Sequence, residues 1–414
     1  MKKTVVRAGF VFDSATGRLE EKWGIVLEGG LVEAAGPLDE LELPEIAEAL
    51  DLSDMTILPG LADCHVHYGL NGETSWETAM LRELVPFQAI RAAEYARRDL
   101  EAGFTMVRAE GDKGFLDAGL RQAIEGGWAA GPRMAVSGHM LSATGGRDSF
   151  APGVSPGDAL FRTCDGPDEV ARASREQMKY GADWIKLAVS GAVTAGTGLP
   201  GAQQFTSGEI LAAVTCAHMN GKKVSAHAHG AESVKAAIRA GADSIEHACL
   251  ADEESLRMMA DFGTWWIPTL APVHLICSRG AEGGVSSVVL ERSRTVREHH
   301  LRLFSRALEL GVRILPGTDA GMPFSFHGNN ALELELMAGA GMSPKEVLRS
   351  STCRSAEMLG WQERCGRISR GCFADLVGVR GNPLENISLL RSVSFVMKGG
   401  QVIRLEAPQK GGRK

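Results

Sequence analysis

Two histidines one residue apart, His65 and His67, end the largely apolar stretch Met55–Tyr68 (MTILPGLADCHVHY). Because side chains at positions i and i+2 of a strand point to the same side, both imidazoles can reach one point at the strand's carboxyl end. Neutral imidazole is a common ligand for zinc-like metals, so the pair predicts half of a metal site. Taken alone, the pair is equally typical of a polar strand edge with two solvated histidines.

Polar side chains with similar chemistry lie within or at the end of other apolar stretches. They are Lys186 in DWIKLAVS, His227 and His229 in VSAHAHG, Glu246 and His247 in SIEHA, and Asp319 in GTDAG. Charged groups do not lie in apolar strands without partners. Where these stretches converge, histidines together with an aspartate and a lysine predict a metal site.

The elements that must position these residues alternate between strand-like and helix-like patterns over residues 55–362. The strand-like stretches are Met55–His67, Phe104–Ala109, Arg133–Ser137, Asp183–Ser190, Lys223–His229, Asp243–His247, Thr264–Leu270 and Val312–Thr318. The helix-like stretches between them are Glu83–Ala102, Pro167–Gly181, Ser207–Asn220, Ala231–Ala240, Asp252–Phe262 and Ser286–Gly311. Eight such units predict an α/β fold, a (β/α)8 TIM barrel, in which active-site groups lie at the carboxyl ends of the strands. A doubly wound sheet is the competing architecture, but no GxGxxG follows an early strand.

Both ends of the chain consist of short strand-like stretches and tight turns. Residues 1–54 and 363–405 share this style, with Gly29-Gly30 and Gly399-Gly400 as hairpin signals. We therefore expect one composite β-sandwich domain, 1–54 plus 363–405, beside the barrel domain 55–362. The basic, glycine-flanked segment 406–414 is expected to be a disordered tail.

Composition excludes several classes of protein. With 44% hydrophobic and 23% charged residues, the 414-residue chain resembles an ordinary soluble globule. Its net charge of −7 argues against nucleic acid or an anionic membrane as a partner. The chain contains no run of 18 apolar residues and its start lacks an apolar signal stretch, so we expect a cytoplasmic location. Eight cysteines without CxxC spacing indicate neither a disulfide framework nor a zinc knuckle.

These motifs carry a resemblance to the amidohydrolase superfamily of metal-dependent hydrolases. The matching stretches, in chain order, are LPGLADCHVH, GADWIKLAVSG, HAHG, SIEHA, GTDAG and, in the returning β domain, GRISRGCFADLVGV. The resemblance covers nearly the whole chain.

The resemblance implies a role for each matching residue. His65 and His67 would bind the more buried of two divalent metal ions, and His227 and His247 the more exposed one. Lys186 would be carboxylated and bridge both metals; its alternative is an ordinary ion-paired lysine in a mononuclear site. Asp319 would be both a metal ligand and the proton shuttle beside a metal-bridging hydroxide. Zinc is the expected metal, and manganese or cobalt suit the same ligands.

Five further residues are candidate substrate contacts, each with a plainer alternative. His139 and Arg147 lie in the loop SGHMLSATGGRD, where the arginine could clamp a carboxylate; both could also be ordinary loop residues. His229 follows the expected ligand of HAHG, so we interpret it as a substrate or supporting group. Tyr68 is a pocket wall or packing, and His327 is undecided. The other histidines lie on or near helical stretches and are expected at the surface: His218, His274, His299 and His300.

Within the superfamily, GADWIKL, HAHG and FHGNNALELELM resemble the prolidase-like, imidazolonepropionase-related branch. That likeness implies cleavage of the amide bond of a dipeptide or N-acyl amino acid, including ochratoxin-like N-acyl aromatic amino acids. It also implies a homo-oligomer, with octamers known in the branch. The alternatives are hydrolysis of a cyclic amide, as in imidazolonepropionase, and a scaffold without activity. The strand-3 loop departs from the pattern of this branch, because it reads TGGRD where several relatives have a histidine after the glycines.

Overall fold

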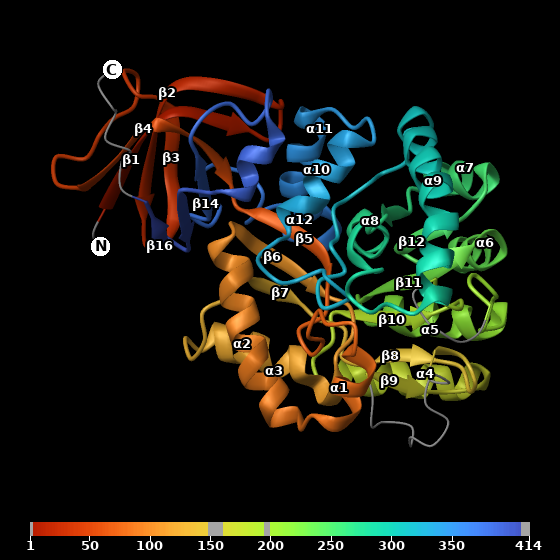
Figure 1. Ribbon diagram of the computed structural model, residues 1–414. Helices are drawn as coiled ribbons and strands as arrows, with labels where there is room; N and C mark the ends of the chain where they lie inside the picture. The colour runs from red at the N-terminus through yellow and green to blue at the C-terminus, as the bar shows by residue number, and fades with distance from the viewer. Residues whose placement is uncertain (1–2, 148–159, 194–198, 407–414) are drawn as a thin grey trace. The chain divides into compact units, whose positions relative to one another are not determined.

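The computed structural model describes residues 3–147, 160–193 and 199–406 (Figure 1). All but the first residue of the expected tail 406–414 lies outside these ranges. The chain divides into two compact units, which we describe separately. The first unit comprises Met1–Ala62, Arg98–Met106 and Ser343–Lys414, and the second comprises Asp63–Arg97 and Val107–Met342. The domain boundaries expected at 54/55 and 362/363 stay a prediction.

The first unit contains a seven-stranded sheet built from both ends of the chain. Its strand order is β16 (Gln401–Leu405), β15 (Phe395–Lys398), β14 (Leu376–Val379), β4 (Glu48–Pro59), β1 (Lys3–Asp13), β2 (Arg18–Glu28) and β3 (Leu31–Pro37). The two ends meet where β4 pairs in parallel with β1 and antiparallel with β14. Buried apolar side chains from both ends, such as Ile25, Ile57 and Phe395, form its core. The expectation of a terminal β domain made from both termini is confirmed.

The expected first barrel strand, Met55–His67, is in fact two strands. Residues 55–59 belong to β4 of the terminal sheet, and the barrel strand is β5 (Leu61–Val66). The break falls at Pro59-Gly60, where proline offers no amide hydrogen to a sheet ladder. A Cβ atom on Gly60 would come 1.9 Å from Oγ1 of Thr105, so the chain needs glycine to pass this point.

Most of the barrel belongs to the second unit. The barrel strands are β5, β6 (Phe104–Ala109), β7 (Arg133–Ala135), β10 (Trp184–Ala188), β11 (Lys223–Gly230), β12 (Ser244–Leu250) and β13 (Trp265–Ile267). The first residues of β5 and β6 are assigned to the first unit. β10 to β13 pair in parallel in chain order, and the Asp183 amide donates to the Val136 carbonyl just beyond β7. Residues 313–316 close the ring, because Leu315 donates to Trp266 and Cys64 donates to Pro316. The expected parallel barrel is confirmed. A small pair, β8 (Met140–Ser142) and β9 (Phe161–Thr163), follows β7 and joins β10.

The helices follow the expected alternation, with a few additional short ones. They are α1 (Trp76–Arg82), α2 (Val85–Glu101), α3 (Leu116–Glu125), α4 (Gly166–Lys179), α5 (Ser207–Met219), α6 (Ala231–Ala240), α7 (Glu253–Phe262), α8 (Leu270–Arg279), α9 (Ser287–Glu309), α10 (Ala331–Gly339), α11 (Pro344–Arg349) and α12 (Ser355–Leu359). Short 3₁₀ turns cover Lys113–Phe115 and Ile387–Arg391, and a π turn covers Ser350–Arg354. Within the described part of the chain, none of the helices has the length and apolarity needed to cross a bilayer.

One expectation about the helices is wrong. His218 is exposed and His274 and His299 are partly exposed, but His300 is only 1% exposed. On α9 it continues the buried stripe that includes Val296 and Phe304, so its spacing turns it toward the barrel. The eight cysteines are all free thiols.

Candidate metal centre

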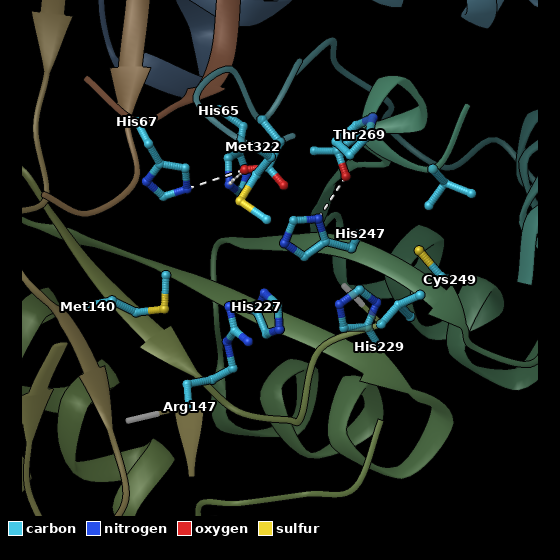
Figure 2. A pocket seen from close by; sticks show the side chains of 14 residues that line it. His65, His67, Met140, Arg147, His227, His229, His247, Cys249, Thr269 and Met322 are labelled. Atoms are coloured by element: carbon cyan, nitrogen blue, oxygen red, sulfur yellow. Dashed lines mark hydrogen bonds and ion pairs between the residues drawn. The ribbon is translucent and has the colours of Figure 1, made fainter. Parts of the chain in front are cut away.

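The carboxyl ends of several barrel strands surround one pocket, which contains most of the expected ligands (Figure 2). Its lining comprises His65, His67, Met140, Arg147, Val193, His227, His229, His247, Cys249, Thr269, Pro272, Val273, Asp319 and Met322. All of these residues belong to the second unit. The barrel therefore brings together side chains that are more than 250 positions apart in the sequence.

The first group of donors consists of His65, His67 and Asp319. Asp319 Oδ1 lies 3.5 Å from Nε2 of His65 and 3.3 Å from Nε2 of His67. The other ring nitrogens are already occupied, because Nδ1 of His65 lies 2.7 Å from Glu246 Oε2 and Nδ1 of His67 lies 2.8 Å from the Gly111 carbonyl. When these Nδ1 atoms donate, both Nε2 atoms present lone pairs toward Asp319. One metal ion fits among the three side chains.

The second group consists of His227, His229 and His247, whose ring centroids lie 4.6 to 4.9 Å apart. Nδ1 of His247 lies 2.7 Å from Oγ1 of Thr269, whose hydroxyl in turn donates to the Pro268 carbonyl. His247 therefore donates through Nδ1 and keeps Nε2 free. In the described structure, neither Nε2 of His227 nor Nδ1 of His229 has a hydrogen-bond partner.

The electrostatics of the pocket keep most of these imidazoles neutral. Burial, reinforced by the positive charge of Lys186 and by neighbouring imidazoles, lowers the pKa of His65, His227 and His247 well below the usual value. Burial and Arg147 lower the pKa of His229 to about 3. Neutral imidazole is the form that binds metal.

The pKa values of His67 and Asp319 shift in the direction opposite to the effect of burial. Burial opposes the charged form of His67, but Asp319 reverses this effect and raises the pKa of His67. Burial also opposes ionisation of Asp319, yet His65, His67 and Lys186 hold the pKa of the carboxyl below its usual value. Asp319 is therefore a carboxylate at neutral pH, as a metal ligand must be.

Lys186 lies in a buried charge network and does not line the pocket. Its Nζ is 2.6 Å from Glu110 Oε2, although neither side chain has a well-aligned hydrogen bond among the described residues. Arg108 lies between two acids, 2.8 Å from Glu110 and 2.8 Å from Glu246, and Glu246 orients His65. The side chains of the two acids, Arg108 and Lys186 are fully buried.

Arg108 and Glu110 are not among the residues predicted from the sequence. Their signal was present, because both interrupt the apolar stretch FTMVRAEG at i and i+2, the spacing that also identified His65 and His67. Glu110, Glu246 and His65 form a third group of potential metal-binding side chains, but here Arg108 and Lys186 supply the positive charge.

Backbone strain is concentrated at this pocket. Three of its lining residues have a positive φ although none is glycine: His247 (68°), Thr269 (50°) and Asp319 (50°). Such conformations cost on the order of 1–3 kcal/mol each and cluster at functional sites. The strain lies on one candidate ligand of each group and on the residue that orients His247.

Arg147 lines the same pocket, and Figure 2 shows its side chain extending toward His227. Its Nε has no hydrogen-bond partner within the described ranges, and burial lowers the pKa of the guanidinium. A guanidinium with unused donors at the edge of a metal pocket suits a substrate carboxylate.

The remaining candidates lie outside the pocket lining. His327 is stacked between Tyr68 and Tyr95, with ring centroids 4.7 and 4.8 Å apart, and its Nε2 lies 3.1 Å from the His67 carbonyl. His139 accepts a hydrogen bond from the Gly114 amide at 3.1 Å, and its ring packs edge-on against Phe115. These contacts support the walls behind the pocket, and a substrate contact for His139, Tyr68 or His327 stays a prediction.

The donor set fits divalent metal ions. Two groups of three donors have their ligand atoms within 4.8 Å of one another. In the second group, Nε2 of His227 and Nδ1 of His229 are buried and have no hydrogen-bond partner among the described residues. Imidazole and carboxylate ligands suit zinc, manganese or cobalt alike, so the geometry identifies a metal centre without identifying the metal.

Comparison with known proteins agrees with this centre. Residues 56–403 match the model of the amidohydrolase family. Ochratoxinase from Aspergillus niger is 31% identical over 374 residues, which cover 84% of this chain and 75% of that protein. A Xaa-Pro dipeptidase with bound methionine in its active site superimposes with a TM-score of 0.90 at 34% identity, over 97% of this chain and 99% of the other. A prolidase complexed with N-methylphosphonate-L-proline gives a TM-score of 0.90 at 31% identity, over 98% and 100% of the two chains.

Proposed function

We propose that this chain, which belongs to the amidohydrolase family of metal-dependent C–N hydrolases, uses two metal ions to cleave an amide bond. The proposed substrates are dipeptide-like molecules or N-acyl amino acids. N-acyl aromatic amino acids related to ochratoxin fall within this class. The observation that carries the proposal is one pocket that holds two groups of potential metal-binding side chains together with Arg147, whose Nε has no hydrogen-bond partner among the described residues. The similarity to a dipeptidase, a prolidase and an ochratoxinase supports the same substrate class.

The two groups divide the binding of metal between them. His65, His67 and Asp319 would hold one ion, and His227 with His247 the other, with His229 beside them. When bound, the metal ions lower the pKa of water toward neutrality and polarise the scissile carbonyl. Glu246 and Thr269 hold the imidazoles of His65 and His247 in place, so the ligands need little rearrangement.

Asp319 is the proposed proton shuttle. It is a carboxylate at neutral pH, and its Oδ1 lies close to the Nε2 atoms of both His65 and His67. As a general base it takes a proton from the water, and as a general acid it gives the proton to the leaving nitrogen. Arg147 would hold the substrate carboxylate through paired N–H donors and fix the amide relative to Asp319.

Carboxylation of Lys186 belongs to this proposal. A fully buried ammonium next to two metal ions is unfavourable, and a carbamate would convert it into an anionic bridge. The carbamate would lie beside Glu110, and Arg108, 2.8 Å from Glu110, offsets the resulting repulsion. We also propose that the protein forms a homo-oligomer, which the resemblance supports. Its proposed location is the cytoplasm, which the composition supports.

The first experiment is metal content per chain, measured together with hydrolysis of a panel of N-acyl amino acids and dipeptides. Two metal equivalents with amide cleavage would support the proposal. One equivalent, with activity limited to cyclic amides, would favour the imidazolonepropionase-like alternative. Lys186→Ala should lower the metal content, and two metals in that variant would refute the carbamate bridge.

Asp319→Asn tests the proton shuttle. We expect fold to be retained and turnover to fall by about 10²–10⁴-fold, the usual contribution of a positioned acid–base group. Asp39→Asn, an exposed acid in the first unit, is the matched control and should be unchanged. Near-normal turnover of Asp319→Asn would exclude the assigned role.

A further inference from the structure

A second cavity is lined by residues of helices α8, α9 and α10 and contains none of the proposed metal-binding side chains. Figure 1 shows where these three helices lie. α8 packs against both other helices, and the cavity between them has a volume of about 260 Å³. Sites for drug-sized ligands measure roughly 300–1,000 Å³. This cavity therefore suits a smaller molecule.

The cavity combines apolar walls with opposite charges. Leu270, Val273 and Leu336 provide apolar surface, while Arg297 of α9 and Glu335 of α10 contribute a cation and an anion. Among the described residues, no carboxylate lies within ion-pair distance of the Arg297 guanidinium. The lining therefore suits a small molecule with an apolar body and charges of both signs.

His300 adds a buried polar group to the same lining. It is 1% exposed, and its Nε2 has no hydrogen-bond partner in the described part of the chain. Nδ1 of His300 lies 3.6 Å from the Cys249 thiol, which can donate to it. When the thiol donates to Nδ1, the ring hydrogen resides on Nε2, which is then a buried donor available to an acceptor on a ligand.

We propose that this cavity binds a free α-amino acid with an apolar side chain. The carboxylate would pair with Arg297 and accept from His300, the ammonium would face Glu335, and the side chain would lie against Leu270 and Leu336. An amino acid of this class is also what the proposed hydrolysis releases, and that connection alone rests on the proposed function.

The cavity shares a wall with the metal centre. Val273 lines both spaces, and Cys249, which contacts His300, lines the metal pocket. Leu270 follows Thr269, the residue that orients His247. A bound amino acid therefore has a direct structural route to a metal ligand.

Hydrogen–deuterium exchange of the metal-loaded protein with millimolar L-leucine tests the site. We expect slower exchange in peptides covering α8 and the end of α10. Arg297→Gln should need at least about ten times more L-leucine to reach the same protection, because the variant loses one charge-assisted hydrogen bond to the ligand. Arg294→Gln, on the same helix but outside the cavity lining, should leave the protection unchanged.

Two further comparisons make the test decisive. Gly339→Leu should also weaken binding, because Gly339 lines the cavity and a Cβ added there meets no atom within 4 Å. 4-Methylpentanoate, which lacks the ammonium, should protect less than L-leucine. Absence of protection, protection confined to peptides around His227 and His247, or full protection in both Arg297→Gln and Gly339→Leu would overturn the proposal. None of these measurements requires amide hydrolysis, so they stand apart from a failure of the proposed function.

Discussion

Replacing Arg108 by methionine should destabilise the protein strongly, although the residue does not touch the pocket. Arg108 is fully buried and lies 2.8 Å from both Glu110 and Glu246. It also donates to the Cys64 carbonyl at 2.8 Å and to Ser244 Oγ at 2.9 Å. Methionine keeps much of the apolar stem and removes the charge and every one of these hydrogen bonds.

The expected magnitude follows from these contacts. At an effective dielectric constant of about 20, a close ion pair is worth about 4 kcal/mol before desolvation is counted. Glu110 would keep Lys186 at 2.6 Å, whereas Glu246 would keep only the neutral partners His65 and Ser244. Removing one partner of a buried ion pair costs about 3–5 kcal/mol, and we expect the free energy of unfolding to fall by this amount.

Urea unfolding of the metal-loaded protein, followed by tryptophan fluorescence, measures this loss. Arg302→Met is the control, because the Arg302 side chain is 69% exposed and its partner Glu298 lies 3.7 Å away. Exposed pairs of this kind contribute at most about 1 kcal/mol. If Arg108→Met unfolds within 1 kcal/mol of the wild type, the network does not compensate buried charge as we argue.

Three further predictions concern the surroundings of the pocket. Glu246→Gln should weaken metal binding about 10–100-fold in a competition titration, because Glu246 orients His65; unchanged affinity would contradict that role. Burial raises the pKa of the Glu333 carboxyl to about 8, although two backbone amides of α8 donate hydrogen bonds to it. Between pH 4.5, the usual pKa of a glutamate, and pH 8, Glu333 therefore carries a proton in the folded state and has lost it in the unfolded state. As pH rises from 4.5 to 8, the unfolding free energy of the wild type should therefore fall relative to that of Glu333→Gln, by at most about 1.4 kcal/mol per pH unit. A difference in unfolding free energy that does not change with pH would refute this shift. Gly317→Ala should lower the free energy of unfolding by about 1–3 kcal/mol and reduce metal content, because the new Cβ would lie 2.7 Å from the Cβ of His65. Thermal unfolding measures the loss of stability. Gly339→Ala is the control and should lose none, because a Cβ at that position meets no atom within 4 Å.

The barrel could be predicted because its signals are local. Each strand is a short apolar stretch, and candidate ligands such as His65 and His247 lie where the stretch ends. The fold rule for parallel barrels then brings those ends together. The break at Pro59-Gly60 was also visible as a turn signal, but only the pairing of β4 with β14 shows that the preceding residues belong to another sheet.

The support behind the pocket was less predictable. His327 and Tyr68 stack on each other from segments far apart in the chain, and no local pattern indicates that contact. Arg108 and Glu110 did have a local signal, since charges in a buried strand require partners. Their partners could not be named from sequence, because Glu246 and Lys186 come from other strands and only the barrel closure places them within 3 Å.

The sheet that joins both ends of the chain also sets the order in which the protein can be completed. The Thr56 hydroxyl donates to the Gly381 carbonyl across 325 positions of sequence, just beyond the end of β14, the strand that pairs with β4 and unites the two termini. At about 5–20 residues per second, a ribosome needs on the order of tens of seconds to supply β14 after β4 has been made. Throughout that time one edge of β4 stays unpaired, and an unpaired strand edge invites association with other chains. Newly made chains and fragments that end before residue 376 are therefore the forms most exposed to aggregation.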